Sequence, residues 1–239
     1  MHARLPGLRR APAALGLLVV LLCAWNNVVV TRLPGPDAAV NATATAVLLT
    51  AARAGGLSWG ELGLGRHRLG AGLRWGGACA ALVACGYAAA LALASAVPGL
   101  RPLLADARVA GLDGGEIASR VLVGIPLGTV LWEEVAFRGV LLAALLRVTS
   151  SRAAVATSAA VFGLWHVRPT IGAVTANDLP GGPVLQAAAV VLGCLATGVA
   201  GVLFVWLRQR SGSLLAPVLL HLATNDLGVL AAAAAHRLG

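Results

Sequence analysis

The sequence predicts an all-α, polytopic integral membrane protein with about seven transmembrane helices. Of its 239 residues, 59% are hydrophobic and only 11% are charged, whereas a typical soluble domain has about 25% charged residues. The mean hydropathy is +0.86, and apolar stretches recur at about 20 residues, the length that crosses a bilayer core. A disordered chain is excluded because it would lack apolar residues, and a soluble domain is disfavoured because it would need more polar surface.

Seven apolar stretches are expected to form helices, each bounded by turn residues or charges. The second is the least apolar, because threonine and asparagine interrupt it. The first follows Arg4, Arg9 and Arg10 in the manner of a signal peptide, but its apolar part is long and the residues around Trp25 suit cleavage poorly. We therefore expect a signal anchor that stays in the mature protein. The seven stretches are 11–30, 38–54, 76–97, 117–146, 153–170, 184–207 and 213–235.

The segment 57–75 differs from the apolar stretches on either side. It alternates leucine and tryptophan with arginine, and its glycines disfavour one long helix. We expect a broken segment that lies in the cytoplasmic interface of the membrane. The chain then divides into an N-terminal part, residues 1–75, with the signal anchor, the second span and this segment, and a transmembrane bundle over residues 76–239.

All 18 cationic residues are arginine, and the net charge is +9. In a soluble protein this charge would suggest nucleic-acid binding, but here the arginines separate apolar stretches, so we expect no nucleic-acid partner. With a cytoplasmic N-terminus, the outside holds six arginines: Arg32, Arg101, Arg108, Arg120, Arg168 and Arg237. The inside holds 11: Arg4, Arg9, Arg10, Arg53, Arg66, Arg68, Arg74, Arg147, Arg152, Arg208 and Arg210.

The acidic residues follow the opposite bias, since only Glu61 lies inside and five lie outside: Asp37, Asp106, Asp113, Glu116 and Asp178. The positive-inside rule therefore predicts a cytoplasmic N-terminus and an external C-terminus. The composition is rich in alanine, glycine and arginine, which suggests a bacterial genome, so we expect a multi-pass protein of the inner (plasma) membrane. The four cysteines have no zinc-binding spacing and are expected to be small core residues.

Three predicted spans contain polar residues that a bilayer core does not solvate. The fourth span has the sequence WEEVAFRG over residues 132–139, the fifth has FGLWH over 162–166, and the seventh has HLATND over 221–226. Counted at about 1.5 Å per residue from the inner ends of the helices, the polar groups fall about 12–20 Å deep. We expect these groups to meet in one water-accessible cavity.

Helical spacing separates the roles of these residues. Glu134 and Arg138 are four residues apart and are expected to form an ion pair. Glu133 points about 100° away, toward a different neighbour. His221 and Asn225 share one helix face, as do Phe162 and His166.

This set of groups suits hydrolysis. A carboxylate beside an imidazole can deprotonate a water, and a second imidazole and a carboxamide can hold an oxyanion. The same Glu133, His166 and His221 can alternatively bind a divalent metal such as zinc. No serine or cysteine lies at a corresponding depth beside a histidine, and the HExxH signature is absent. Packing devices and a proton or ion relay are the alternatives to catalysis.

The three motifs resemble those of the CPBP family of intramembrane endopeptidases, which is also called the CAAX-protease, bacteriocin-processing or Abi family. The resemblance covers about residues 117–230, and WxELGLxR at Trp59 to Arg66 is also similar to these proteins. The motifs stand in the family's order and spacing: EExxFR from Glu133 to Arg138, FxxxH from Phe162 to His166, and HxxxN from His221 to Asn225.

The resemblance implies an active site inside the helical bundle that opens to the cytoplasm, which would agree with a cytoplasmic N-terminus. It implies that Glu133 and His166 activate the water, and that His221 and Asn225 stabilise the oxyanion. It further implies that Glu134 and Arg138 organise the site. A metal-free general base is favoured, because a set that includes Asn225 forms a poor zinc cage; zinc bound by Glu133, His166 and His221 stays the alternative.

The expected function is therefore hydrolysis of a peptide bond in a peptide or membrane-protein substrate within the lipid bilayer. A prenylated CAAX substrate is what the eukaryotic branch of the family implies, but we do not expect it in a bacterium. A non-catalytic transporter or scaffold that uses the Glu/His cluster as a relay is the competing hypothesis. It is disfavoured because no second half with matching broken helices is found. Asp226 has no assigned role.

Overall fold

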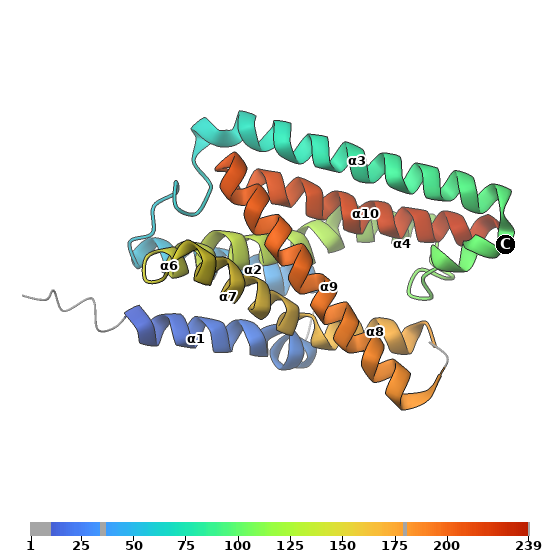
Figure 1. Cartoon of the computed structure of the whole chain (residues 1–239), viewed down its shortest axis with the longest axis horizontal. Helices are drawn as coiled ribbons and strands as arrows, with labels where there is room; N and C mark the ends of the chain where they lie inside the picture. The colour runs from blue at the N-terminus through green and yellow to red at the C-terminus, as the bar shows by residue number, and fades with distance from the viewer. Residues whose placement is uncertain (1–10, 34–36, 179–180, 239) are drawn as a thin grey trace, which may run out of the picture.

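The computed structural model describes residues 11–33, 37–178 and 181–238, which are helical with no strand among them. The helices run back and forth between two ends of a bundle (Figure 1). The long ones are α1 (Ala11–Ala24), continued by η2 (Trp25–Val29) and η3 (Val30–Arg32), α2 (Asp37–Ala54), α3 (Leu69–Ala96), α7 (Ser151–Trp165), α8 (Val167–Ala176), α9 (Gly182–Ser211) and α10 (Leu215–Leu238). Two short 3₁₀ turns, η4 (Arg66–Arg68) and η5 (Pro98–Leu103), flank α3.

A further long helix passes through the middle of the bundle and changes its winding several times. It comprises α4 (Gly114–Ser119), η6 (Arg120–Gly124), η7 (Pro126–Val130), α5 (Leu131–Glu133), η8 (Glu134–Leu141) and α6 (Leu142–Leu146), of which η6, η7 and η8 are π-helical. It begins at a capping box, in which Asp113 and Glu116 each bond to the other's backbone N–H. Its second half is buried from Trp132 to Ala143.

All seven predicted stretches are helical, with two corrections to their boundaries. The third helix begins at Leu69, so residues 69–75 of the expected interfacial segment belong to α3. The fifth stretch is not one helix, because His166 separates α7 from α8.

Four helices of the described residues are long and apolar enough to cross a membrane: Ala13–Arg32, Arg66–Ala96, Gly182–Ser211 and Leu215–Leu238. The count of seven crossings stays a prediction. The other helices are too short or too polar for that criterion: α7 has only 15 residues, and the central helix contains Glu133, Glu134 and Arg138.

One end of the bundle, here the amino end, consists of residues 55–68, 147–150 and 208–214. Arg147 Nε donates to Glu61 Oε1 at 2.7 Å, and Arg208 Nη2 donates to the Glu61 backbone oxygen at 2.8 Å. Leu214 N donates to Gly63 O at 2.8 Å. The hydrogen bond from Arg147 lowers the pKa of Glu61 to about 2. These contacts place three segments that are far apart in sequence at one end. Arg4, Arg9 and Arg10, predicted to lie on the same side, fall outside the described residues.

The other end, here the carboxyl end, consists of residues 97–113 with the ends of α8 and α10. Asn177 Nδ2 donates to Asp106 Oδ1 at 3.2 Å, and His236 Nε2 lies 2.9 Å from Asp106 O. Arg120 Nη1 donates to Arg108 O at 2.9 Å. The hydrogen bonds from Arg108 lower the pKa of Asp106 to about 2. The loop before the central helix is thus tied to three helices.

Glycines let two pairs of helices approach closely. Helix α3 lies along α10 (Figure 1), and a Cβ atom on Gly76 would lie 2.8 Å from the backbone oxygen of Ala216. In α7, a Cβ on Gly163 would lie 2.9 Å from the Cys194 oxygen of α9. Small residues at such crossings are the usual basis of helix packing in membranes. This packing holds α7 and α10, which carry two of the predicted motifs, against the rest of the bundle.

Candidate active site

The carboxylate of Glu133 lies at the centre of the predicted site and is only 4% exposed. Its Oε1 accepts a hydrogen bond from Trp165 Nε1 at 3.0 Å. Its Oε2 lies 3.8 Å from His166 Nε2 and 3.9 Å from His221 Nε2. This oxygen is buried and has no hydrogen-bond partner among the described residues. Both distances are too long for a direct hydrogen bond and leave room for a bridging water.

The two imidazoles present the same kind of atom to Glu133. His166 Nδ1 lies 2.8 Å from the Phe162 carbonyl oxygen, and His221 Nδ1 lies 2.8 Å from Glu134 Oε1. Both partners only accept hydrogen bonds, so each Nδ1 carries a proton and donates. In the neutral rings, each Nε2 therefore directs a lone pair toward Glu133. Glu133 Oε2 therefore faces two acceptor nitrogens, at 3.8 and 3.9 Å, and none of these three atoms is a donor.

Glu134 holds His221 in this orientation. Its Oε1 accepts a second hydrogen bond from Arg138 Nη1 at 2.9 Å, which is the ion pair that the spacing predicts. Arg138 is 1% exposed, and its Cζ lies 3.9 Å from the ring centroid of Phe162 and 4.6 Å from that of Phe204. The two phenylalanine rings thus hold the guanidinium of Arg138 in place. Arg138 in turn holds the carboxylate of Glu134, and this carboxylate orients the imidazole of His221.

His166 is positioned by an interruption of the helix backbone. In a continuous helix, Arg168 N would donate to Leu164 O, four residues earlier. Instead, the carboxamide of Asn27 lies between them: its Oδ1 accepts from Arg168 N at 2.9 Å and its Nδ2 donates to Leu164 O at 3.0 Å. Pro169, which has no N–H, follows at once. A side chain inserted into the helical ladder is a recognised cause of a kink, and the kink falls at His166.

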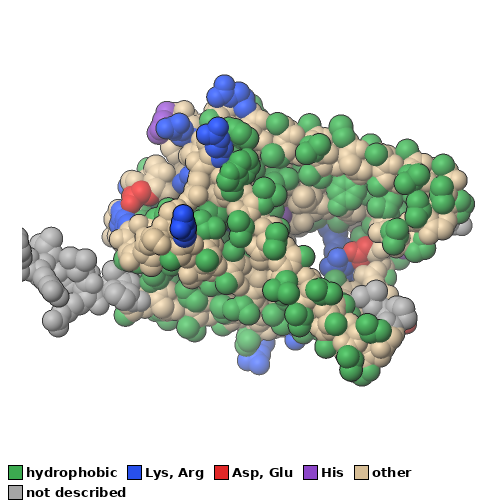
Figure 2. Space-filling view, in the orientation of Figure 1, with side chains coloured by type: hydrophobic (Ala, Val, Ile, Leu, Met, Phe, Trp, Pro, Cys, Tyr) green, Lys and Arg blue, Asp and Glu red, His purple; other side chains and the backbone are tan. Residues whose placement is uncertain are grey.

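A cavity of about 660 Å³ reaches the site. Its lining includes Glu133, Trp165, His166 and Asn225, so the predicted carboxamide borders the same cavity as the carboxylate and one imidazole. Figure 2 shows the molecule hollowed near the carboxyl end, with charged side chains of both signs inside. The outer lining consists of residues of that end: Asp37, Leu103, Asp106, Arg108, Arg120 and Asn177.

Residues 117–227 match the family model described as Rce1-like, type II CAAX prenyl endopeptidase. Over this region the chain is similar to the CAAX-protease family. The match confirms the resemblance and includes all three motifs. No curated protein and no solved structure matches the chain. Together with the long apolar helices, the family points to a multi-pass membrane peptidase.

The direction of the cavity bears on two expectations, namely the side on which the site opens and the side on which the N-terminus lies. A site open to the cytoplasm was expected to agree with a cytoplasmic N-terminus. The cavity, however, opens at the carboxyl end, away from the amino end where the arginine-rich loops lie. This cavity does not meet both expectations together, and each of them stays a prediction.

The CAAX-protease site departs from the geometry of a zinc centre. Zinc ligands lie about 2.0–2.1 Å from the metal, which places neighbouring ligand atoms about 3.3 Å apart in a tetrahedron. The oxygen of Glu133 is 3.8 and 3.9 Å from the two histidine nitrogens. Across residues 11–33, 37–178 and 181–238, no three His, Cys, Asp or Glu side chains are grouped to hold a metal ion. The residues as placed do not fit a preformed zinc cage.

Two residues of the CAAX-protease site were missed by sequence reasoning. Trp165 was noted only as a neighbour of His166, and its hydrogen bond to Glu133 has no signal in the spacing. Asn27 was not singled out in the sequence and lies among the residues around Trp25 that suit cleavage poorly, although it is a carboxamide at the end of an apolar stretch and Pro169 interrupts another. Asp226 still has no role, and its buried Oδ1 has no hydrogen-bond partner in the described part of the chain.

Proposed function

We propose that this CAAX-protease family member is an intramembrane endopeptidase that hydrolyses a peptide bond with a water activated by Glu133 and His166. The observation that supports this is the buried Glu133 Oε2, which has no hydrogen-bond partner among the described residues and lies 3.8 Å from His166 Nε2. One water at about 2.8 Å from both atoms would donate a hydrogen to each of them. Its own lone pairs then point away from both acceptors, toward the cavity where a substrate carbonyl would lie.

The reaction proceeds through a tetrahedral intermediate. The water oxygen attacks the carbonyl carbon while Glu133 takes one of its protons, as a general base. The carbonyl becomes an oxyanion. Glu133 then gives the proton to the amide nitrogen, the C–N bond breaks, and a carboxylic acid and an amine leave. Trp165 keeps Glu133 Oε1 occupied, so that Oε2 does the proton transfer.

His221 and Asn225 stabilise the oxyanion in this proposal. His221 takes up a proton from solvent on Nε2 when the substrate binds and donates it to the oxyanion, and the neighbouring carboxylate of Glu134 stabilises the resulting imidazolium. Asn225 donates from its carboxamide nitrogen. Arg138 keeps Glu134 in place. The roles expected from the resemblance thus suit the observed contacts, with Glu134 acting on His221 directly.

The test is cleavage of a candidate peptide by the purified full chain in detergent. We expect Glu133→Gln and His166→Ala to lower kcat by about 10²–10⁴-fold, the usual contribution of general acid–base catalysis. Glu61→Gln is the matched control, since this carboxylate lies on the surface at the amino end and should leave kcat unchanged. Full activity in either site variant would refute the assignment of the catalytic pair.

A further inference from the structure

The two ends of the bundle differ in charge. Each end is counted together with the helix turns that lead into it. The described residues counted at the amino end hold eight arginines and one acid: Arg53, Arg66, Arg68, Arg74, Arg147, Arg152, Arg208, Arg210 and Glu61. Those of the carboxyl end hold six arginines and five acids: Arg32, Arg101, Arg108, Arg120, Arg168, Arg237, Asp37, Asp106, Asp113, Glu116 and Asp178. Adding Arg4, Arg9 and Arg10 of the sequence raises the first count of arginines to 11. Short loops rich in arginine are retained in the cytoplasm.

The hydrogen bonds across each end support this division independently of hydropathy. The segments of the amino end are joined through Glu61 and Gly63, and those of the carboxyl end through Asp106. The charge count therefore compares two faces that the fold itself assembles. The two groups of charges are therefore assigned by contacts in the structure, and the assignment does not require that the second apolar stretch be a membrane span.

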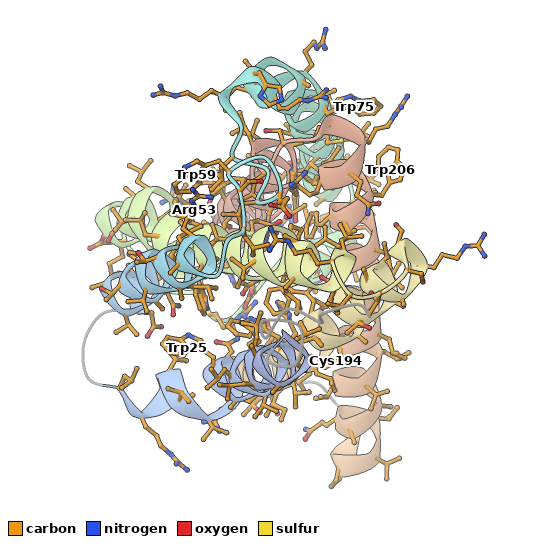
Figure 3. All side chains as sticks on the ribbon, turned by 90° about the vertical axis from the view of Figure 1, so that its left-hand side faces the viewer. Trp25, Arg53, Trp59, Trp75, Cys194 and Trp206 are labelled. Carbon is orange, nitrogen blue, oxygen red and sulfur yellow. The ribbon has the colours of Figure 1, made fainter. Side chains whose placement is uncertain are left out.

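Aromatic residues mark the amino end as a membrane interface. Arg53 lies 4.9 Å from the ring centroid of Trp59, and Arg210 lies 5.4 Å from that of Trp75, which meets Trp206 at 5.7 Å. Figure 3 shows Arg53, Trp59, Trp75 and Trp206 in a view onto this end. Tryptophan and arginine together are typical of the boundary between lipid and water.

The mouth of the active-site cavity lies at the other end. Asp37, Asp106, Arg108 and Arg120 line it, and so does Leu103, which is 79% exposed. Charges of both signs at the mouth suit the polar backbone of an extended polypeptide. No lining residue of this cavity comes from the loops of the amino end.

From these observations we infer that the active site opens to the extracytoplasmic side of the membrane. The substrate is then a polypeptide segment presented from outside the cytoplasm, in an exported or membrane-anchored protein. A prenylated C-terminus on a cytoplasmic protein would lie on the wrong side. The substrate class rests on the proposed peptidase function, whereas the sidedness rests on charge and geometry alone.

The test is single-cysteine labelling in cells. Cys23, Cys79, Cys85 and Cys194 are first replaced by alanine in the full chain. Leu103→Cys then reports on the mouth of the cavity, Thr129→Cys on its interior, and Arg152→Cys on the amino end as the matched control. Intact spheroplasts and permeabilised ones are treated with a membrane-impermeant maleimide.

We expect Leu103→Cys and Thr129→Cys to be labelled in intact spheroplasts, and Arg152→Cys to be labelled at least tenfold more after permeabilisation. The opposite pattern, or labelling of Leu103→Cys and Arg152→Cys alike in intact spheroplasts, would overturn the inference. Either outcome leaves the proposed hydrolysis intact, because the experiment does not involve catalysis.

A second measurement tests the substrate side. A membrane-impermeant peptide that the detergent-solubilised enzyme cleaves is added to sealed right-side-out or inverted vesicles. We expect cleavage in the right-side-out vesicles only, and cleavage confined to inverted vesicles would overturn the inference. Absence of cleavage in detergent would instead count against the proposed function.

Discussion

Asn27 should control both the stability of the helix break and the activity of His166. Asn27→Leu keeps the approximate size of the side chain but removes its amide, which bonds to Leu164 O and Arg168 N at 3.0 and 2.9 Å. Two structural responses are possible, and they predict different magnitudes. If the break persists, two exposed hydrogen bonds are lost at about 0.5–1.5 kcal/mol each, so the free energy of unfolding falls by about 1–3 kcal/mol.

If the helix closes instead, Arg168 N bonds to Leu164 O and little stability is lost. His166 then moves with the straightened helix, and a misplacement of about 1 Å costs roughly 10²-fold in rate. In both cases the activity at a given temperature falls. Asn27→Asp keeps the acceptor for Arg168 N but loses the donor to Leu164 O, so it should fall between the wild type and Asn27→Leu.

The assay combines thermal unfolding in detergent with kcat for peptide cleavage. Thr31→Val is the matched control, because it removes a local hydrogen bond to Val28 O in the same segment without reaching α7 or α8. We expect this control to stay within about 0.5 kcal/mol of wild type. If Asn27→Leu matches the wild type within twofold in kcat and within the control's range in stability, the carboxamide does not position His166.

Four further outcomes are expected. Trp165→Phe keeps an aromatic ring but loses the hydrogen bond to Glu133 Oε1, so kcat should fall about tenfold with the fold retained, as a net loss of about 1–1.5 kcal/mol implies. Gly76→Ala, whose Cβ would meet the α10 backbone, should destabilise the bundle by about 1–3 kcal/mol, while Gly77→Ala, with open space around it, should not. Because the pKa of Glu61 is lowered to about 2, the ionised residue stabilises the fold above about pH 4.5, and this contribution is lost as the pH falls toward 2. Between these pH values, Tm should therefore fall less steeply in Glu61→Gln than in the wild type. Finally, treatment with a chelator should leave cleavage unchanged, and stoichiometric zinc that is required for turnover would contradict the water mechanism.

Local sequence patterns predicted the parts of the site that depend on one helix. The four-residue spacing of Glu134 and Arg138 gave their ion pair correctly, and the pair survives the π-helical winding of that segment. Similar depths of three motifs predicted that Glu133, His166 and His221 would meet, which they do within 4 Å.

The parts that depend on two distant segments were out of reach. Asn27 and Arg168 are 141 residues apart, and nothing in either neighbourhood indicates that one interrupts the helix of the other. The bond between His221 and Glu134 likewise requires the packing of α10 on the central helix. The direction of the cavity follows from the tilt and stacking of whole helices, which hydropathy does not encode.

The two acceptor nitrogens that face Glu133 Oε2 have a consequence for the end of the catalytic cycle. A protonated amine has a positive charge and one hydrogen for each of these three acceptors, whereas a water has only two hydrogens. Cleavage creates such an amine beside Glu133 when the new N-terminus gains a proton. The amine product should therefore be retained longer than the acid product, and its departure should limit turnover. Small primary amines of matching size are accordingly a starting point for inhibitors of this site.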